Sequence, residues 1–122
     1  IAKENEQRIE DERKTNSVIL CEKVGMVLEK LANNGQYPTT SIVLQKHYRK
    51  NGYYVQKATT KEYSDERTSY NPIGEMIDGD LNIIIDWFKQ YDFKIERREI
   101  LIWQYGIGQI KALELNIMPD VN

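Results

Sequence analysis

The chain carries few side chains that could act as nucleophiles or general bases. It has a single histidine, His47, and a single cysteine, Cys21. A Ser/His or Cys/His catalytic arrangement needs a base beside the nucleophile, so any such site would have to include His47. That histidine lies between Lys46 and Tyr48, which is typical of a surface residue, whereas Cys21 lies in an apolar stretch, where burial raises the pKa of a thiol. The sequence therefore predicts that the protein is not an enzyme.

Two short motifs could hold an ion, but each has a simpler structural explanation. Asp78 and Asp80 could place two carboxylates beside a magnesium or calcium ion, yet a helix start prefers the same residues as caps. Gly106 and Gly108 join two expected β segments, so their amides are not aimed by a helix start as in a phosphate-binding loop. With one cysteine and one histidine, a structural zinc site of the usual Cys/His type is also excluded. We expect no metal and no cofactor.

The stretch KHYRKNGYYVQK has the composition of a binding site. Its basic side chains can contact phosphates, and its tyrosines can stack on bases or other flat ligands. A second candidate lies in the polar segment that follows, because tyrosine and arginine are enriched at binding hot spots. The alternative for both is a solvated surface with half-buried tyrosines. The residues predicted to bind are Lys46, Arg49, Tyr53, Tyr54, Arg67 and Tyr70.

Composition and charge limit the classes of protein that fit. The 122 residues suit one domain, and 40% hydrophobic with 30% charged residues is typical of a soluble globular chain. A net charge of −2 gives no overall attraction to nucleic acid. Apolar runs such as VILC and ILIW are far shorter than the roughly 20 residues of a membrane span. The lone cysteine excludes an intrachain disulfide and favours a reducing, intracellular location.

A long helix is expected at the start of the chain. Residues 3–32 contain no proline, and the stretch after them holds Gly35, which suits a left-handed helix cap, and Pro38, which blocks continuation. A helix of 30 residues is about 45 Å long, more than a domain of this size can cover. We therefore expect residues 1–17 to form a charged arm that is continuous with a single α+β domain at residues 18–122.

The charged arm is expected to pack on a second copy of the chain. Ile9 continues the apolar stripe of the helix into the arm, and symmetric self-association is the usual outcome for such a surface. The alternative is a solvated, partly frayed helix held by weak ion pairs between neighbouring turns. The residues predicted to form the oligomer interface are Ile9, Arg13, Asn16 and Leu20.

The pair Asn51-Gly52 permits two interpretations. It is the strongest short signal for a β-hairpin turn, and it also suits the left-handed end of a helix. Because residues 39–50 begin with a capping threonine and end with strong helix formers, we expect a helix there that stops at Asn51-Gly52. Lys46, Arg49 and Lys50 would then share one side, and a strand would follow from residue 53 to about residue 60.

The remainder of the chain completes a predicted α+β fold with three helices. Residues 61–79 are polar and without clear periodicity, which indicates a functional or mobile loop. Residues 80–91 have the apolar spacing of an amphipathic helix. Two β segments around residues 105–108 close the protein as a hairpin of a small, mostly antiparallel sheet. Residues 100–105 carry apolar side chains on both faces, so this strand is expected to be central or covered by an oligomer.

The stretches LANNGQY and LQKHYRKNGYYV give the chain a family resemblance. A helix end followed by Gly52, Tyr53 and Val55 resembles small uncharacterised accessory proteins encoded by phages of Gram-positive bacteria, over roughly residues 20–57. The resemblance implies a phage or mobile-element origin and a binding or structural role. It identifies no catalytic residue.

These observations predict a non-enzymatic, phage-type accessory protein that binds a host protein or a small charged ligand as a homo-oligomer. The first alternative is a minor virion or assembly component, and the second is a nucleic-acid-binding module. The expected location is the cytoplasm of a bacterial host cell, or the virion in the structural alternative.

Overall fold

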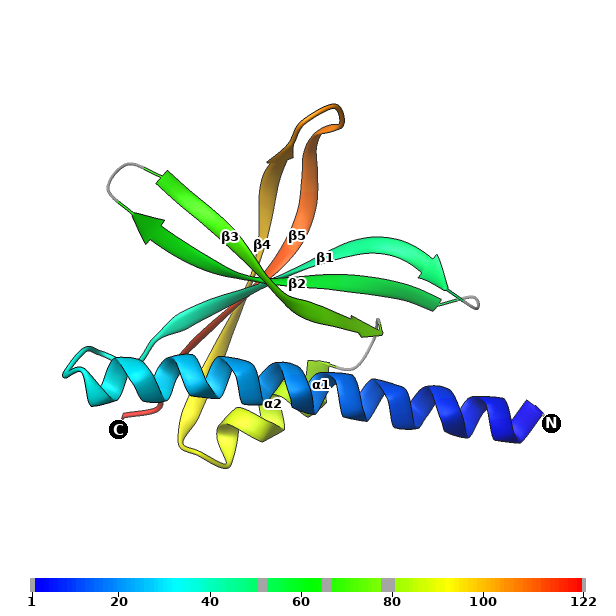
Figure 1. Ribbon diagram of the computed structural model, residues 1–122, viewed down its shortest axis with the longest axis horizontal. Coiled ribbons are helices and arrows are strands. Elements are labelled where there is room, and N and C mark those ends of the chain that lie inside the picture. Colours follow the sequence, from blue (N-terminus) through cyan, green and yellow to red (C-terminus); the bar gives the residue numbers. More distant parts are fainter. Residues whose placement is uncertain (1, 51–52, 65–66, 78–80, 122) are drawn as a thin grey trace.

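Strands make up most of the chain after a long first helix. The computed structural model describes residues 2–50, 53–64, 67–77 and 81–121. The elements are α1 (Ala2–Asn33), β1 (Thr40–Lys50), β2 (Tyr53–Ser64), β3 (Arg67–Ile77), α2 (Leu81–Lys89), β4 (Phe93–Gln104) and β5 (Gly108–Pro119). The strands form one antiparallel sheet in the order β3-β2-β1-β5-β4, and Figure 1 shows its strong twist above the two helices.

The predicted N-terminal helix and its end are confirmed. Gly35 has a φ of 73°, the left-handed conformation that glycine adopts without strain. The amide of Gln36 donates to the carbonyl of Leu31, and that of Gly35 donates to Ala32, which together form a Schellman cap. In Figure 1 the N-terminal part of α1 continues beyond β3 and α2.

The helix predicted for residues 39–50 is wrong, because this segment is strand β1. Ile42 and Leu44 point into the core on one face of the strand, and Val43 between them is buried outside that cluster, as the alternation of a strand requires. Each residue from Thr40 to Leu44 pairs with β5, and β2 pairs along the other side of the strand. Residues 51–52 lie outside the described residues. Their neighbours Lys50 and Tyr53 face each other across β1 and β2, as in the hairpin interpretation.

The loop predicted for residues 61–79 is also wrong over most of its length. β2 continues to Ser64, and β3 occupies residues 67–77. The segment lacks an apolar period because β3 is an edge strand, where polar residues are tolerated. Pro72 and Gly74 lie opposite a register shift between Ala58 and Thr59, and an edge or a bulge is where a sheet accepts proline.

The helix predicted for residues 80–91 is confirmed as α2, and the C-terminal hairpin is confirmed as β4–β5. β4 is the last strand of the sheet, so the expectation that it is central is wrong for the single chain. The alternative, that an oligomer covers it, stays a prediction.

The core lies between the two helices and one face of the sheet. Side chains from α1, α2 and alternate strand positions meet there, and each large apolar side chain buried in this way contributes roughly 1.5–3 kcal/mol. The cluster comprises Leu20, Cys21, Val24, Leu28, Ile42, Leu44, Ala58, Met76, Ile84, Phe88, Leu115 and Ile117.

Candidate binding cleft

The sheet divides into two hairpins at the position where β1 and β5 part. These strands pair only from Thr40 to Leu44 on β1 and from Leu113 to Ile117 on β5. Over residues 45–50 and 108–112, which the structure describes, they form no further pairs. The register of β1 on β2 shifts between Lys46 and Tyr48, and such a bulge bends a strand and increases its twist. Figure 1 shows the β1–β2 and β4–β5 hairpins pointing apart.

A cleft of about 650 Å³ lies between the two hairpins. Its volume is within the roughly 300–1,000 Å³ that is usual for ligand sites. Its walls include the facing edges of β1 and β5, which do not pair with each other over the residues named above. The lining residues are Leu44, Gln45, Lys46, Gln56, Glu99, Gln104, Ile107, Ile110, Lys111, Ala112 and Leu113.

Gln56 is a buried polar residue on the wall of this cleft. It pairs with Lys46 across the strands and is only 8% exposed. Its Oε1 atom accepts no hydrogen bond. A buried acceptor without a donor costs about 1–3 kcal/mol, so a donor that entered the cleft would gain from binding here.

The charges and polar groups at the cleft are few. Gln45 Nε2 donates to Gln104 Oε1 across it at 3.4 Å, which is long for such a bond. The charged lining residues are Lys46, Lys111 and Glu99, and Lys111 is exposed. The cleft therefore suits a ligand that carries hydrogen-bond donors, apolar groups and a negative charge that can contact Lys111.

The structure brings only some of the predicted binding residues together. Arg49 pairs with Tyr54, and Tyr53 lies in the neighbouring pair, so these residues and Lys46 lie at the same end of β1 and β2. Lys46 also lines the cleft.

The other two predicted residues lie elsewhere. Arg67 pairs with Ser64 and Tyr70 pairs with Lys61, toward the opposite end of β2. At about 3.3 Å per residue, Tyr54 and Ser64 are roughly 33 Å apart along the strand. The six predicted residues therefore do not form a single site.

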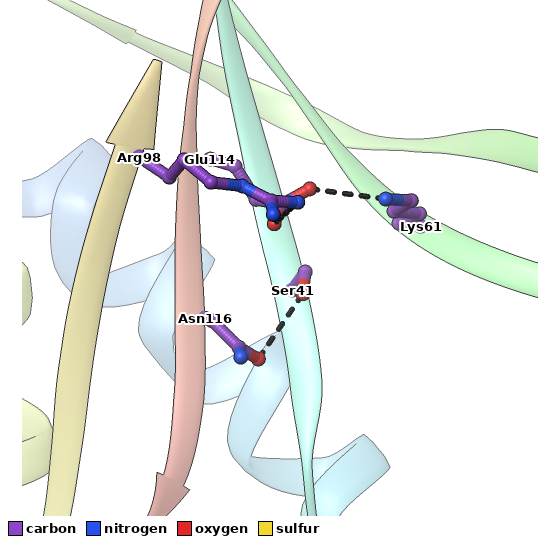
Figure 2. A network of polar contacts seen from close by, with 5 residues as sticks. All are labelled: Ser41, Lys61, Arg98, Glu114 and Asn116. Atoms are coloured by element: carbon purple, nitrogen blue, oxygen red, sulfur yellow. Dashed lines mark hydrogen bonds and ion pairs between the residues drawn. The ribbon is translucent and has the colours of Figure 1, made fainter. Parts of the chain in front are cut away.

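A polar network on the sheet face opposite the helices was not predicted from the sequence. Glu114, 4% exposed, accepts from Lys61 Nζ at 3.2 Å and from Arg98 Nη2 at 2.9 Å. Ser41 Oγ donates to Asn116 Oδ1 at 3.2 Å on the same face (Figure 2). Since Glu114 is compensated by two cations from different strands, the network ties β2, β5 and β4 together.

The predicted interface residues of the N-terminal helix have different environments. Leu20 is 1% exposed because it packs in the core of its own chain, so it has almost no surface for a second copy. Arg13 and Asn16 are half-buried, and Arg13 Nη1 lies 3.4 Å from Glu10 Oε2. The side chain of Ile9 lies outside the described part of the chain.

A second cavity, of about 460 Å³, lies between the helices and the start of β4. Met26, Trp87 and Tyr91 are among its lining residues, and the ring centroids of Trp87 and Tyr91 are 4.8 Å apart. A Cβ on Gly25 would lie 3.1 Å from the Trp87 ring, so this indole packs closely on α1. The cavity is mostly apolar, with Glu22 and Glu29 as its charged lining residues.

The groups considered for catalysis have the following environments. Cys21 is fully buried, and burial, followed by the charge of Glu22, raises the pKa of its thiol to about 12. Its thiol is therefore not a nucleophile near neutral pH. The side chains of His47, Asp78 and Asp80 lie outside the described residues. Elsewhere in the described chain, no three His, Cys, Asp or Glu side chains are grouped so that they could hold a metal ion.

Comparison of the chain with family models, with curated proteins and with solved structures finds no match in any of the three. Within the described ranges, no helix has the length and apolar character needed to cross a membrane.

Proposed function

We propose that the protein is a non-catalytic binding protein that acts as a homo-oligomer and holds an extended segment of a partner protein between β1 and β5. One observation carries the proposal: β1 and β5 part beyond the Leu44–Leu113 pair, at residues 45–50 and 108–112. They leave facing backbone edges beside the buried acceptor Gln56 Oε1.

An extended polypeptide matches this cleft in its hydrogen bonds. Its main chain presents N–H and C=O groups in alternation, and strand addition to an exposed sheet edge is a recurring mode of peptide recognition. The part of β5 that does not pair with β1, residues 108–112, spans about 16 Å, which corresponds to a bound segment of about five residues.

The lining also indicates which side chains such a segment carries. Ile107, which is exposed, and Ile110 offer apolar contacts to side chains of an extended peptide. The exposed cation of Lys111 favours an acidic side chain in the segment. The proposed ligand is therefore a short, mainly apolar and acidic stretch of a partner protein.

The buried Cys21, with its raised pKa, is not proposed as a nucleophile. The resemblance to phage accessory proteins extends the proposal to a host protein as the partner and to the bacterial cytoplasm as the place of action.

Selection from a surface-displayed library of random twelve-residue peptides tests this function. The enriched peptides are expected to be acidic and apolar, and to bind Gln56→Leu and Lys111→Glu about tenfold more weakly than the wild type in fluorescence anisotropy. Gln90→Leu, which changes an exposed glutamine at the end of α2, is the matched control. Failure to enrich any peptide, or equal binding to all variants, would contradict the proposal.

A second candidate function, nucleic-acid binding, is favoured by the register of β1 and β2. It sets Arg49 opposite Tyr54 and Lys50 opposite Tyr53 at one end of a two-stranded ribbon. Basic residues that contact phosphates make affinity fall steeply with salt. Binding of a labelled single-stranded oligonucleotide should then weaken both with added salt and in the Lys46→Ala/Arg49→Ala variant, and binding without a salt dependence would exclude it.

A further inference from the structure

β4 presents a long strand edge that none of the described residues pairs with. It has 12 residues and lies at the end of the strand order, with β5 on its inner side. Leu101 is 60% exposed and Trp103 is 72% exposed. Proteins normally shorten, bend or cover a long edge with an apolar end of this kind, because its unpaired N–H and C=O groups accept another strand.

We propose that β4 pairs antiparallel with β4 of a second copy around a two-fold axis at Arg98, which joins two five-stranded sheets into one. This inference rests on the self-association in the proposed function and names its surface. Successive residues of β4 point their backbone groups alternately toward β5 and outward. Hydrogen bonds between two copies therefore form only if outward-pointing residues of one β4 lie opposite outward-pointing residues of the other. This requires that the two-fold axis passes through a residue of β4 and not through a peptide bond between two residues.

An axis at Arg98 gives complementary charges on the face that carries the helices. Arg97 of each copy lies opposite Glu99 of the other, so two ion pairs form across the axis. Directly opposite side chains of unlike charge stabilise an antiparallel pair, and like charges destabilise it.

The same register covers the exposed apolar side chains. Leu101 lies opposite Ile95 of the second copy, and Trp103 lies opposite Phe93. Ile95 and Phe93 already pack against the core of their own chain, so the two exposed side chains extend existing apolar surfaces. Eleven residues of each copy, Phe93 to Trp103, are paired.

Arg98 lies on the axis, opposite its own copy, and this contact needs a compensating charge. Figure 2 shows that compensation: Arg98 Nη2 donates at 2.9 Å to Oε1 of Glu114, the buried carboxylate on the neighbouring strand. Each Arg98 at the axis is therefore hydrogen-bonded to Glu114 of its own chain, and this carboxylate reduces the repulsion between the two arginine cations.

Neighbouring registers match less well on the helix-bearing face. An axis at Glu99 sets the two Glu99 carboxylates against each other and Arg97 against Leu101. An axis at Arg97 sets Glu96 opposite Arg98 on the other face, but on the helix-bearing face it sets two arginines together and Ile95 against Glu99, and it places Trp103 opposite residue 91, outside the strand. The pattern on the helix-bearing face therefore selects the axis at Arg98.

Charge reversal tests both the surface and the register. Arg97→Glu and Glu99→Arg each place two like-charged contacts across the axis, so each variant alone is expected to dimerise at least tenfold more weakly. In a mixture, both carboxylates of an Arg97→Glu copy would face arginines of a Glu99→Arg copy, so the two variants are expected to form a heterodimer. Native mass spectrometry of the separate and mixed variants reports these species, and Lys30→Glu, an exposed change on α1, is the control for altered charge.

The outcomes separate this inference from the proposed function. A monomeric wild type at micromolar concentration would overturn both the homo-oligomer and the β4 pairing. A wild-type dimer that persists in both reversal variants would overturn the β4 pairing alone, and monomeric variants that do not combine would overturn the register. Circular dichroism checks that each variant is folded. If one is not, Trp103→Gln at the exposed end of β4 replaces it, with at least a tenfold loss of dimerisation expected and an unchanged dimer contradicting the proposal.

Discussion

The two edges of the sheet differ in how they are protected. On β3, Pro72 lacks an N–H group, and Gly74 has a φ of 146° beside an irregular register with β2. Lys23 of α1 donates from Nζ to the carbonyl of Ile73 at 3.0 Å, so the helix also satisfies a backbone group of this strand. These are the devices by which natural sheets prevent edge pairing.

β4 carries charged side chains at residues 94 and 96–99, but it has no proline over its described length. Its register with β5 is continuous from Phe93 to Gln104, without a bulge, and its exposed end is apolar. The backbone of β3 is therefore protected by proline, a bulge and α1, whereas the backbone of β4 lacks these three devices, which is the pattern expected if β4 is an interface. Substitutions on the two edges should accordingly have different consequences.

The largest effect is expected from Glu114→Ala, because this carboxylate serves both halves of the sheet. Its loss leaves Lys61 on β2 without its ion pair and Arg98 on β4 without its compensating charge. Removing one partner of a buried pair costs about 3–5 kcal/mol, and the exposure of Arg98 reduces this, so the free energy of unfolding should fall by about 2–3 kcal/mol. Urea unfolding measures it, and β4 self-association should weaken as well.

Glu114→Gln is the control for that change. It keeps one acceptor oxygen, for either Lys61 or Arg98, and places an amide NH2 group beside the other cation. Its loss of stability should be somewhat smaller than that of Glu114→Ala because the side chain keeps its size and one hydrogen bond, while the repulsion between Arg98 side chains at the axis remains. Equal stability of Glu114→Ala and the wild type would show that the network does not hold β4 to the rest of the sheet.

A smaller effect is expected from Lys23→Met, which removes protection from β3. The hydrogen bond to the Ile73 carbonyl is lost while the apolar part of the side chain is retained. A single hydrogen bond of this kind contributes about 0.5–1.5 kcal/mol, so urea unfolding should show a loss of that size or less. Lys30→Met, at an exposed position on the same helix, should have little effect, and an equal loss in both variants would contradict the role given to Lys23.

Local signals in the sequence predicted some elements well. Gly35 ended α1 where expected, since a left-handed cap depends on a few neighbouring residues. The amphipathic pattern at residues 81–89 was equally local. Residues 39–50 were misread because Asn51-Gly52 suits both a helix end and a hairpin, and pairing with β5, more than 60 residues later in the chain, decides between them.

The candidate site could be predicted only in small part. Lys46 was identified from its basic, tyrosine-rich neighbourhood, and it does line the cleft. Gln56 was not identified, because nothing in the local pattern VQKA marks a glutamine whose burial depends on how two hairpins part. β3 was not predicted for a related reason. Its sequence RTSYNPIGEMI does not alternate apolar and polar residues, and this alternation is the pattern by which a strand is recognised.

The smallest effect is expected from Pro72→Thr, which restores a backbone N–H to the β3 edge. Stability should change by no more than about 0.5 kcal/mol, because the residue is exposed and lies at a bulge. Native mass spectrometry should show no species larger than the dimer, since the contact of Lys23 with the Ile73 carbonyl remains. Two free edges on one sheet would allow open-ended growth, whereas one free edge closes as a dimer. Higher oligomers in this variant would therefore show that proline alone, and not α1, protects β3.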